Sequence, residues 1–306
     1  MDLCSGENAD NRRERPSVES QTLLLRELNQ DEIPTAVELT WQLFSDPANR
    51  SYPLFHSQDD MRTEYASRLQ EQNAALLGCF RERRLIGLLC YFFHPGEHYL
   101  QTTALAVAED CDTVASELLK CLSASFKGYE ICVGITAENT CVAEALQSNG
   151  YELIEVSLDM RLGRSQFIDQ YSSNHEIARI DRTDLEEYAG FHTTHFSDIY
   201  WSIERLRRNV DQWAIFALKT EGKISGGIFL RADAGGAEIF GMAFEDSADD
   251  HAASALLSKA LRTVFDENPD VDEVVFFTDE DDRFNQRAAL SNGFRCHSRY
   301  RCYRNA

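Results

Sequence analysis

The 306-residue sequence lacks several features that would place it in a familiar class of protein. None of its nine cysteines forms a CxxC pair, so the sequence indicates neither a zinc site nor a disulfide framework. No apolar run reaches the roughly 18 residues that a membrane-spanning helix needs, and the polar first 21 residues lack the apolar region of a secretory signal. We therefore expect a cytoplasmic protein with free thiols and no membrane partner.

Basic residues are also scarce. The chain has 30 Lys and Arg against 51 Asp and Glu, a formal net charge of -21. Nucleic-acid backbones and anionic membrane surfaces require a basic footprint, so we expect neither as a partner. The acidic surface would suit a cationic amine, although it also serves simply to keep a protein soluble.

The length allows two domains, and the pattern of apolar residues gives the same order of elements twice. Each half is expected to contain a strand, two helices, a β-hairpin, a fourth strand, a helix, a strand, a helix and a last strand. In the first half the expected ranges are 22–28, 33–44, 59–71, 74–80, 85–93, 99–107, 113–126, 129–136, 139–148 and 153–162. In the second half they are 177–180, 182–195, 202–209, 213–218, 224–230, 238–244, 250–264, 272–278, 283–290 and 296–303.

Local identities support a duplication. They pair residues 84–87 with 223–226, 115–119 with 253–257, and 148–151 with 291–294. All three lie in the same order, on the same expected elements, at offsets of about 138 to 143 residues. The sequence thus predicts an N-terminal tail, two domains and a polar linker between them, with the tail at 1–21, the domains at 22–163 and 175–306, and the linker at 163–174.

Three repeated motifs resemble those of tandem GCN5-related N-acetyltransferases (GNAT). The first is the hairpin, whose charged turn precedes Ile86-Gly87 in one half and Ser225-Gly226 in the other. The second is a strand that ends in 105–107 or 242–244 and leads through an acidic loop into an Ala/Leu-rich helix. The third runs from Asn139 to 150–151, with 282–294 as its counterpart. The resemblance implies an α/β fold of two tandem domains, each a mixed, mainly antiparallel sheet flanked by helices.

The resemblance also implies acetyl-CoA as co-substrate. In the family, the pantetheine amides pair with the free backbone of the fourth strand, and the diphosphate lies at the N-terminus of the next helix. Carried onto this chain, the cofactor-binding residues would be Ala106, Val107, Asn139, Met242, Ala243 and Phe244. The helix-leading loops 109–114 and 245–252 lack the Gly-rich, basic pattern of the family and carry carboxylates instead.

Catalytic residues follow from the same resemblance. Glu238 stands on the fourth strand of the second half, where family members often place a general base. Its first-half equivalent is Gln101, which cannot accept a proton, with Glu97 and His98 as substitutes just upstream. The position of the family's proton-donating Tyr falls on Leu146 and Ala289.

The acceptor pocket would lie between the first two helices of a domain. In the second half these carry the predicted substrate-binding residues His192, His195, Tyr200 and Trp201. Because no carboxylate stands at helical spacing from the two histidines, we expect no metal there. In the first half the corresponding aromatic residues are Trp41, Phe44, Tyr52, Phe55 and His56.

Two functions remain open from the sequence. One is an N-acyltransferase that moves an acetyl or other acyl group from its CoA thioester to a small amine, as a monomer or homodimer. The alternative is a catalytically inactive binding or scaffold protein that keeps the duplicated fold while its cofactor motifs have degenerated.

Overall fold

The fold is described from a computed structural model, which describes residues 22–171, 174–197, 199–233, 235–245 and 249–305. The predicted tail and part of the predicted linker lie outside these residues. In the first half the elements are β1 (Leu24–Glu27), α1 (Ile33–Phe44), α2 (Gln58–Arg68), β2 (Ala74–Arg81), β3 (Arg84–His94), β4 (Tyr99–Val107), α3 (Cys111–Ser125), β5 (Glu130–Thr136), α4 (Thr140–Ser148) and β6 (Tyr151–Gly163).

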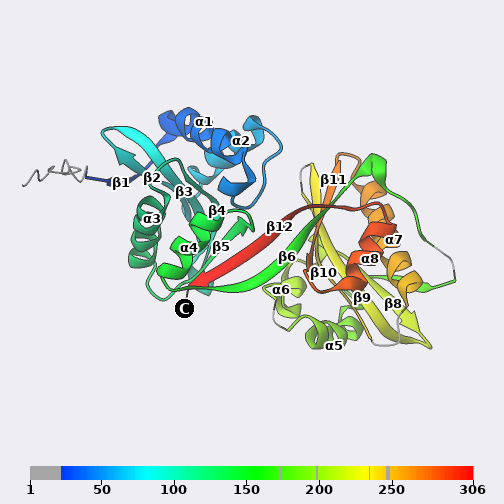
Figure 1. Cartoon of the computed structure of the whole chain (residues 1–306). Helices are drawn as coiled ribbons and strands as arrows, with labels where there is room; N and C mark the ends of the chain where they lie inside the picture. Colours follow the sequence, from blue (N-terminus) through cyan, green and yellow to red (C-terminus); the bar gives the residue numbers. More distant parts are fainter. Residues whose placement is uncertain (1–21, 172–173, 198, 234, 246–248, 306) are drawn as a thin grey trace, which may run out of the picture.

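The second half repeats this order. Its elements are β7 (Glu176–Ile180), α5 (Leu185–His195), α6 (Ile203–Arg208), β8 (Ala214–Thr220), β9 (Lys223–Asp233), β10 (Gly236–Phe244), α7 (Asp250–Glu267), β11 (Glu273–Asp279), α8 (Arg283–Ser291) and β12 (Arg295–Asn305). The predicted α/β fold class is confirmed, with the helices flanking a large mixed sheet (Figure 1).

Short polar side chains set the beginnings of several helices. Ser57 caps α2, Asn139 caps α4, Asp249 caps α7 and Asp282 caps α8, each accepting a hydrogen bond from a backbone N–H of the first turn. Such a cap stabilises a helix by about 1 kcal/mol. The sequence therefore fixes where these four helices start.

The described strands form a single 12-stranded sheet, in the order β1-β2-β3-β4-β5-β12-β6-β11-β10-β9-β8-β7. The last strand of each half lies in the other half. Strand β12 pairs with β5 on one side and β6 on the other, and β6 pairs with β11. Figure 1 shows β12 and β6 running together between the two halves. The sequence pattern shows the repeat but not this exchange of strands.

The helices cover the two faces of the sheet in the same way in both halves. Helices α1 and α2 cover one face of the first half, and α5 and α6 cover the same face of the second half. Helices α3, α4, α7 and α8 cover the opposite face. We use the name central face for the middle of the sheet face on which α1, α2, α5 and α6 lie. This part of the face is formed by β5, β12, β6 and β11.

One disulfide corrects the expectation that all the thiols are free. Cys111, at the start of α3, is bonded to Cys141 in the first turn of α4. The two residues lie 30 positions apart, so no short cysteine spacing could reveal the pair. The bond ties the two helices of the first half together at their N-terminal ends. No helix among the described residues has the length and apolar character for crossing a membrane.

The exchange of strands should couple the unfolding of the two halves. Removing either half would leave β5 or β11 without its neighbouring strand, so neither half keeps a complete sheet alone. We expect a single cooperative transition in differential scanning calorimetry, with equal calorimetric and van't Hoff enthalpies. Two separable transitions would show that each half is stable by itself.

Candidate functional site

The sheet opens at the same place in both halves. In the first half, β4 pairs with β5 only from Tyr99 to Gln101, and the pairing of β4 with β3 has a bulge at Thr103. In the second half, β10 pairs with β11 only from Gly236 to Ile239, and its bulge falls at Phe240. A β-bulge bends its strand and often re-aims side chains beside an active site. Beyond each bulge the parallel strands separate and leave a gap.

Unpaired backbone groups of β10 face the gap of the second half. Glu245 N–H donates to Ser225 of β9. Because N–H groups alternate between the two sides of a strand, those of Met242 and Phe244 must point away from β9 and toward the gap. Neither N–H has a hydrogen-bond partner among the described residues. They are available to a ligand that adds itself to the strand edge.

Asn285 of α8 lies across the same gap. Its Nδ2 donates to the carbonyl of Met242 at 2.8 Å and to Asp282 Oδ2 at 2.7 Å. Its Oδ1 is buried and has no partner among the described residues. An unsatisfied buried acceptor is costly, so this atom favours a ligand that carries an N–H donor.

Glu238 lies on β10, two residues before the bulge. Burial raises its pKa to about 7, and the neighbouring carboxylates add to the rise while Arg231 opposes it. Arg231 is its cross-strand neighbour on β9 and pairs instead with Asp233. No described residue donates a hydrogen bond to Glu238. The result is a carboxylate that changes protonation near neutral pH on the same side of the sheet as the central face.

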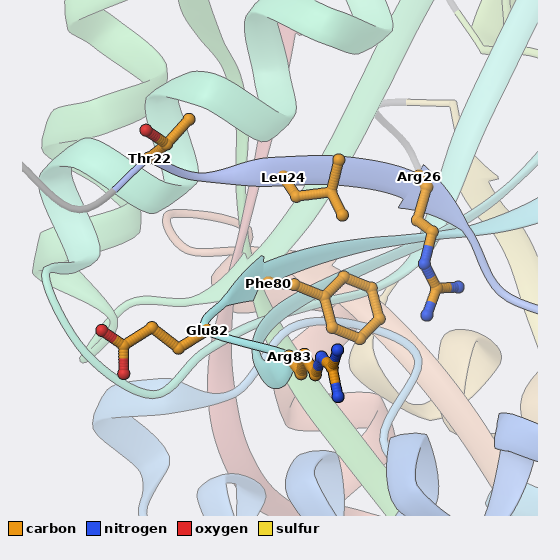
Figure 2. Close-up of a pocket in the computed structure, with 6 residues that line it drawn as sticks. All are labelled: Thr22, Leu24, Arg26, Phe80, Glu82 and Arg83. Carbon is orange, nitrogen blue, oxygen red and sulfur yellow. The ribbon is translucent and has the colours of Figure 1, made fainter.

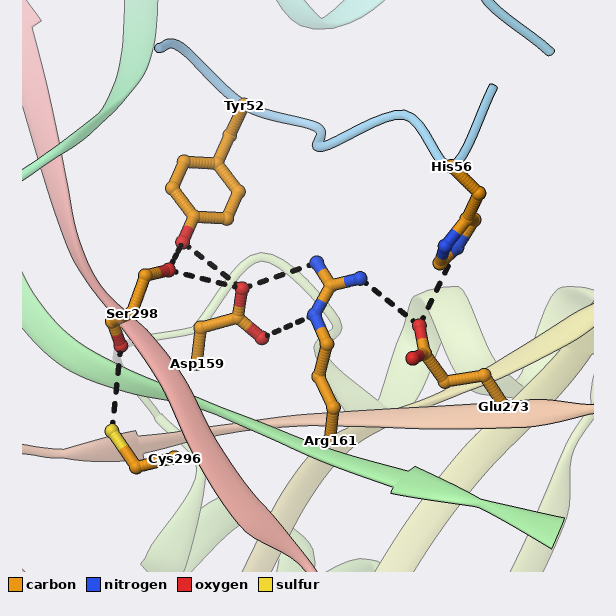
Figure 3. Close-up of polar contacts among 7 residues, drawn as sticks. All are labelled: Tyr52, His56, Asp159, Arg161, Glu273, Cys296 and Ser298. Carbon is orange, nitrogen blue, oxygen red and sulfur yellow. Dashed lines mark hydrogen bonds and ion pairs between the residues drawn. The ribbon is translucent and has the colours of Figure 1, made fainter. Parts of the chain in front are cut away.

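A buried polar network occupies the middle of the central face (Figure 3). Asp159 of β6 is fully buried and receives two hydrogen bonds from Arg161, at 2.9 and 3.1 Å. Arg161 also donates to Glu273 of β11 at 3.0 Å, and Tyr52 donates to Asp159 at 3.0 Å. A buried charge needs such partners, because removing one costs about 3–5 kcal/mol. The network fixes strands β6 and β11 and the loop that carries Tyr52.

The connections between paired helices cross from one half to the other. From the first half, His56 reaches Glu273 at 3.4 Å. From the second half, Tyr200 donates to Glu97 at 2.6 Å, and Arg205 pairs with the same carboxylate at 3.1 Å. Residues that the sequence places around two separate acceptor pockets therefore meet over one shared face.

An acidic pocket of about 600 Å³ lies at the end of β11, bounded by Ile154, Glu155, Val156, Asp279, Glu280, Asp281 and Arg283. Burial raises the pKa of Glu155, and burial together with Asp282 and Asp281 raises the pKa of Asp279. Glu155 also contributes to the raised pKa of Glu238. Ser157 donates a hydrogen bond to Glu155 at 2.6 Å and opposes the rise in its pKa.

A second pocket, of about 430 Å³, lies at the outer edge of the sheet beside β1 (Figure 2). It is bounded by Thr22, Leu24, Arg26, Phe80, Glu82 and Arg83. Arg26 covers the ring of Phe80 at 4.1 Å and pairs with Glu32. None of the predicted site residues lines this pocket.

Arginines lie beside the carboxylates of the two acidic loops. In the first half, Arg81 pairs with Asp110 at 2.6 Å and Arg84 pairs with Glu109 at 2.5 Å. In the second half, Arg287 of α8 pairs with Asp250 at 2.9 Å. Residues 246–248 of the predicted loop 245–252 lie outside the described residues. The loop sequences alone could not reveal these cations, which come from other elements.

The four predicted substrate-binding residues do not share one environment. His192 is buried in an aromatic core and its Nε2 contacts the Trp201 carbonyl at 2.8 Å. Burial lowers its pKa. His195, three residues later on α5, pairs with Glu245 at 3.2 Å. Tyr200 and Trp201 lie nearer the central face, where Arg231 lies over the Trp201 ring at 5.5 Å.

The predicted cofactor-binding residues lie around the two gaps. Met242, Ala243 and Phe244 form the part of β10 beyond its bulge, and Ala106 and Val107 form the same part of β4. Asn139 is buried, caps α4 and donates to the Arg50 carbonyl at 3.1 Å, so its side chain is already bonded within the chain. The Leu146 and Ala289 positions are fully buried and supply no proton donor.

Several residues of the site were not predicted, namely Glu155, Asp159, Arg161, Arg231, Glu273, Asp279 and Asn285. A signal existed in β6, where residues 155, 157, 159 and 161 are all polar. Such alternation marks one polar face of a strand. The sequence pattern does not give the strand order. It is the strand order that brings the polar face of β6 under Tyr52 and beside Glu238. Among the described residues, no group of three or more His, Cys, Asp and Glu is arranged to hold a metal ion.

The sequence matches no protein-family model and no curated relative. Solved structures are similar over most of the chain. A GCN5-related N-acetyltransferase from Sphaerobacter thermophilus has a TM-score of 0.66 at 14% identity, over 92% of this chain and 95% of that one. A tandem GNAT protein from the clavulanic acid biosynthesis pathway gives 0.58 at 13% identity, over 92% and 98%. A GNAT-family acetyltransferase from Colwellia psychrerythraea gives 0.50 at 12%, over 92% and 100%. The chain therefore has the GCN5-related N-acetyltransferase fold.

Glu238 should make stability depend on pH. Its pKa in the folded chain is about 7, against 4.5 for a free side chain. The stability that the protonated form gives is complete below pH 4.5 and is lost as the pH rises through 7, a change on the order of 3 kcal/mol. Glu238→Gln should thus stabilise the chain at pH 8 and change little at pH 4.5, measured by urea unfolding. The control Glu152→Gln changes an exposed residue, and its effect on the free energy of unfolding should not depend on pH. The same effect in both variants would contradict the raised pKa of Glu238.

Proposed function

We propose that the chain is an N-acyltransferase that uses acetyl-CoA or another acyl-CoA and transfers the acyl group to a small amine at the second half. One observation carries the proposal. Beside β10 two backbone donors have no partner among the described residues, and Glu238, with a pKa of about 7, lies on the same strand two residues before the bulge. The backbone edge suits an acyl carrier with amides, and the carboxylate suits a proton acceptor.

The residues of the second gap fit a pantetheine chain. The N–H groups of Met242 and Phe244 would donate to its carbonyls, and Asn285 Oδ1 would accept from one of its amides. These contacts would complete a strand-like pairing along β10. The bound CoA thioester would supply the activated acyl group.

Glu238 would remove the proton that the amine must lose before it attacks the thioester. A general base is most effective when its pKa lies near the working pH, and burial places Glu238 there. The bulge at Phe240 separates Glu238 from the free N–H of Met242 by only a few residues of one strand. Because Leu146 and Ala289 are apolar, no side chain at the family's Tyr position would protonate the departing thiolate, so CoA would leave as the thiolate and take its proton from water.

The acceptor would carry a positive charge besides its reacting amine. Glu155 and Asp279 lie in the acidic pocket with raised pKa values, and a cation bound between them would offset the cost of their burial. Tyr200 and Trp201 would add an aromatic wall. We further propose a cytoplasmic location and a monomer or homodimer.

Arg287 would meet the cofactor diphosphate at the start of α7. It now pairs with Asp250 through two hydrogen bonds of 2.9 Å. Both side chains are exposed and water screens their attraction, so a diphosphate can replace the carboxylate at small cost.

Acetyl-CoA should raise the melting temperature of the chain, because a ligand of the folded state alone adds stability with concentration. Asn285→Ala removes one acceptor from the second gap and should weaken binding by about 1 kcal/mol, roughly fivefold in Kd by calorimetry. Asn268→Ala is the matched control, since its side chain bonds only to the Val264 carbonyl at the far end of α7. If the melting temperature does not change at millimolar acetyl-CoA or other acyl-CoAs, the proposal is wrong. The alternative, a catalytically inactive binding or scaffold protein, would then be favoured.

Turnover should rise with pH through about 7 as Glu238 loses its proton. The measurement is the acylation of a panel of mono- and diamines, monitored through the free CoA thiol that the reaction releases. The values of kcat/KM should increase with pH through about 7. Glu238→Gln should lower kcat by about 10²- to 10⁴-fold, the usual contribution of a general base, and leave the Kd for acetyl-CoA within about twofold. Unchanged turnover in the variant would remove Glu238 as the base.

A further inference from the structure

Residues 50–52, here named the insert, lie in the gap of the first half. The N–H of Tyr52 donates to the Gly134 carbonyl at 2.9 Å, and the N–H of Thr136 donates to the Arg50 carbonyl at 3.3 Å. Between them Ser51 forms an antiparallel bridge with Ile135. The insert thus pairs with the separated part of β5 as a short strand.

The other side of the insert reaches β4. Ser51 is fully buried, and its Oγ accepts a hydrogen bond from the N–H of Leu105 at 2.7 Å. Leu105 stands two residues after the bulge of β4, as Met242 stands two residues after the bulge of β10. The N–H of Leu105 is therefore satisfied by the chain itself, whereas that of Met242, its counterpart, has no partner among the described residues.

Side chains hold the insert in this place. Thr136 Oγ1 donates to the Pro47 carbonyl at 2.6 Å, and Asn139 donates to the Arg50 carbonyl at 3.1 Å. On the far side, the hydroxyl of Tyr52 is bound to Asp159. A ligand that entered this gap would have to break these bonds together and leave buried polar groups unpaired, each at a cost of about 1–3 kcal/mol.

We propose that the insert is a built-in replacement for the pantetheine chain, which closes the first half to acyl-CoA. The second half, where the N–H groups of Met242 and Phe244 have no partner in the part of the chain that the structure describes, then holds the one acyl-CoA site per chain. The single site in the second half rests on the proposed function, whereas the closure of the first half rests on the contacts of the insert alone.

Hydrogen exchange followed by mass spectrometry on the full chain tests both statements. Without ligand, a peptide covering 103–108 should exchange slowly and one covering 240–245 should exchange faster. Acetyl-CoA should slow exchange at 240–245 and leave 103–108 unchanged. Slower exchange at 103–108 on adding acetyl-CoA would overturn the proposal, because it would place the ligand in the first gap.

A pair of variants tests the insert without any ligand. Ser51→Ala removes the acceptor of Leu105 and should speed exchange at 103–108 about tenfold, whereas Ser51→Thr keeps the hydroxyl and should preserve the slow rate. Equal rates in the wild type and Ser51→Ala would show that the insert does not hold β4, and the proposal would be wrong. Absence of protection at 240–245, with the Ser51 result as expected, would overturn the proposed function and its single site while supporting a closed first half.

Discussion

The position of β12 between β5 and β6 is the constraint on which the rest of the structure depends. Each half gives its last strand to the other, so neither half could form its part of the sheet alone. The same exchange brings β6 and β11 side by side and sets Arg161 next to Glu273. Asp159 belongs to the same network and accepts a hydrogen bond from Tyr52. Because these charges are buried, they tolerate little displacement. The shared central face is therefore a direct consequence of the strand order and not of contacts between two finished domains.

From this common frame the two halves differ at a few positions. Both fourth strands carry a bulge two residues after the position of Gln101 or Glu238, and both separate from the next strand beyond it. A carboxylate in the second half replaces the amide of the first. In the first gap the backbone donor of Leu105 is bonded to Ser51, whereas the N–H of Met242 has no partner among the described residues. On the proposed function, the chemistry would therefore take place in the second half.

The sequence predicts the elements well and their assembly poorly. Apolar periodicity and caps such as Asn139 and Asp249 give nearly every helix and strand, because these signals are local. Strand exchange leaves no local trace, since β6 and β12 read as ordinary strands whichever neighbour they choose. Glu238 could be proposed from its place on the strand, but its raised pKa depends on surrounding carboxylates from other strands. His192 likewise depends on its surroundings, because the sequence does not show that its side chain is buried among aromatic rings.

The exchange would also explain how a first half that is closed to acyl-CoA, as proposed, can persist. If the halves were independent, loss of the first cofactor site would leave a domain with no physical reason to remain. Here β6 of the first half is the neighbour of β11, and β5 is a neighbour of β12, so removing the first half would expose the strands that border the second gap. The loop that closes the first gap then continues through Tyr52 and His56 onto the face beside Glu238. The first half can therefore be closed to the ligand and still be needed for the fold, because its strands hold those of the second half in position.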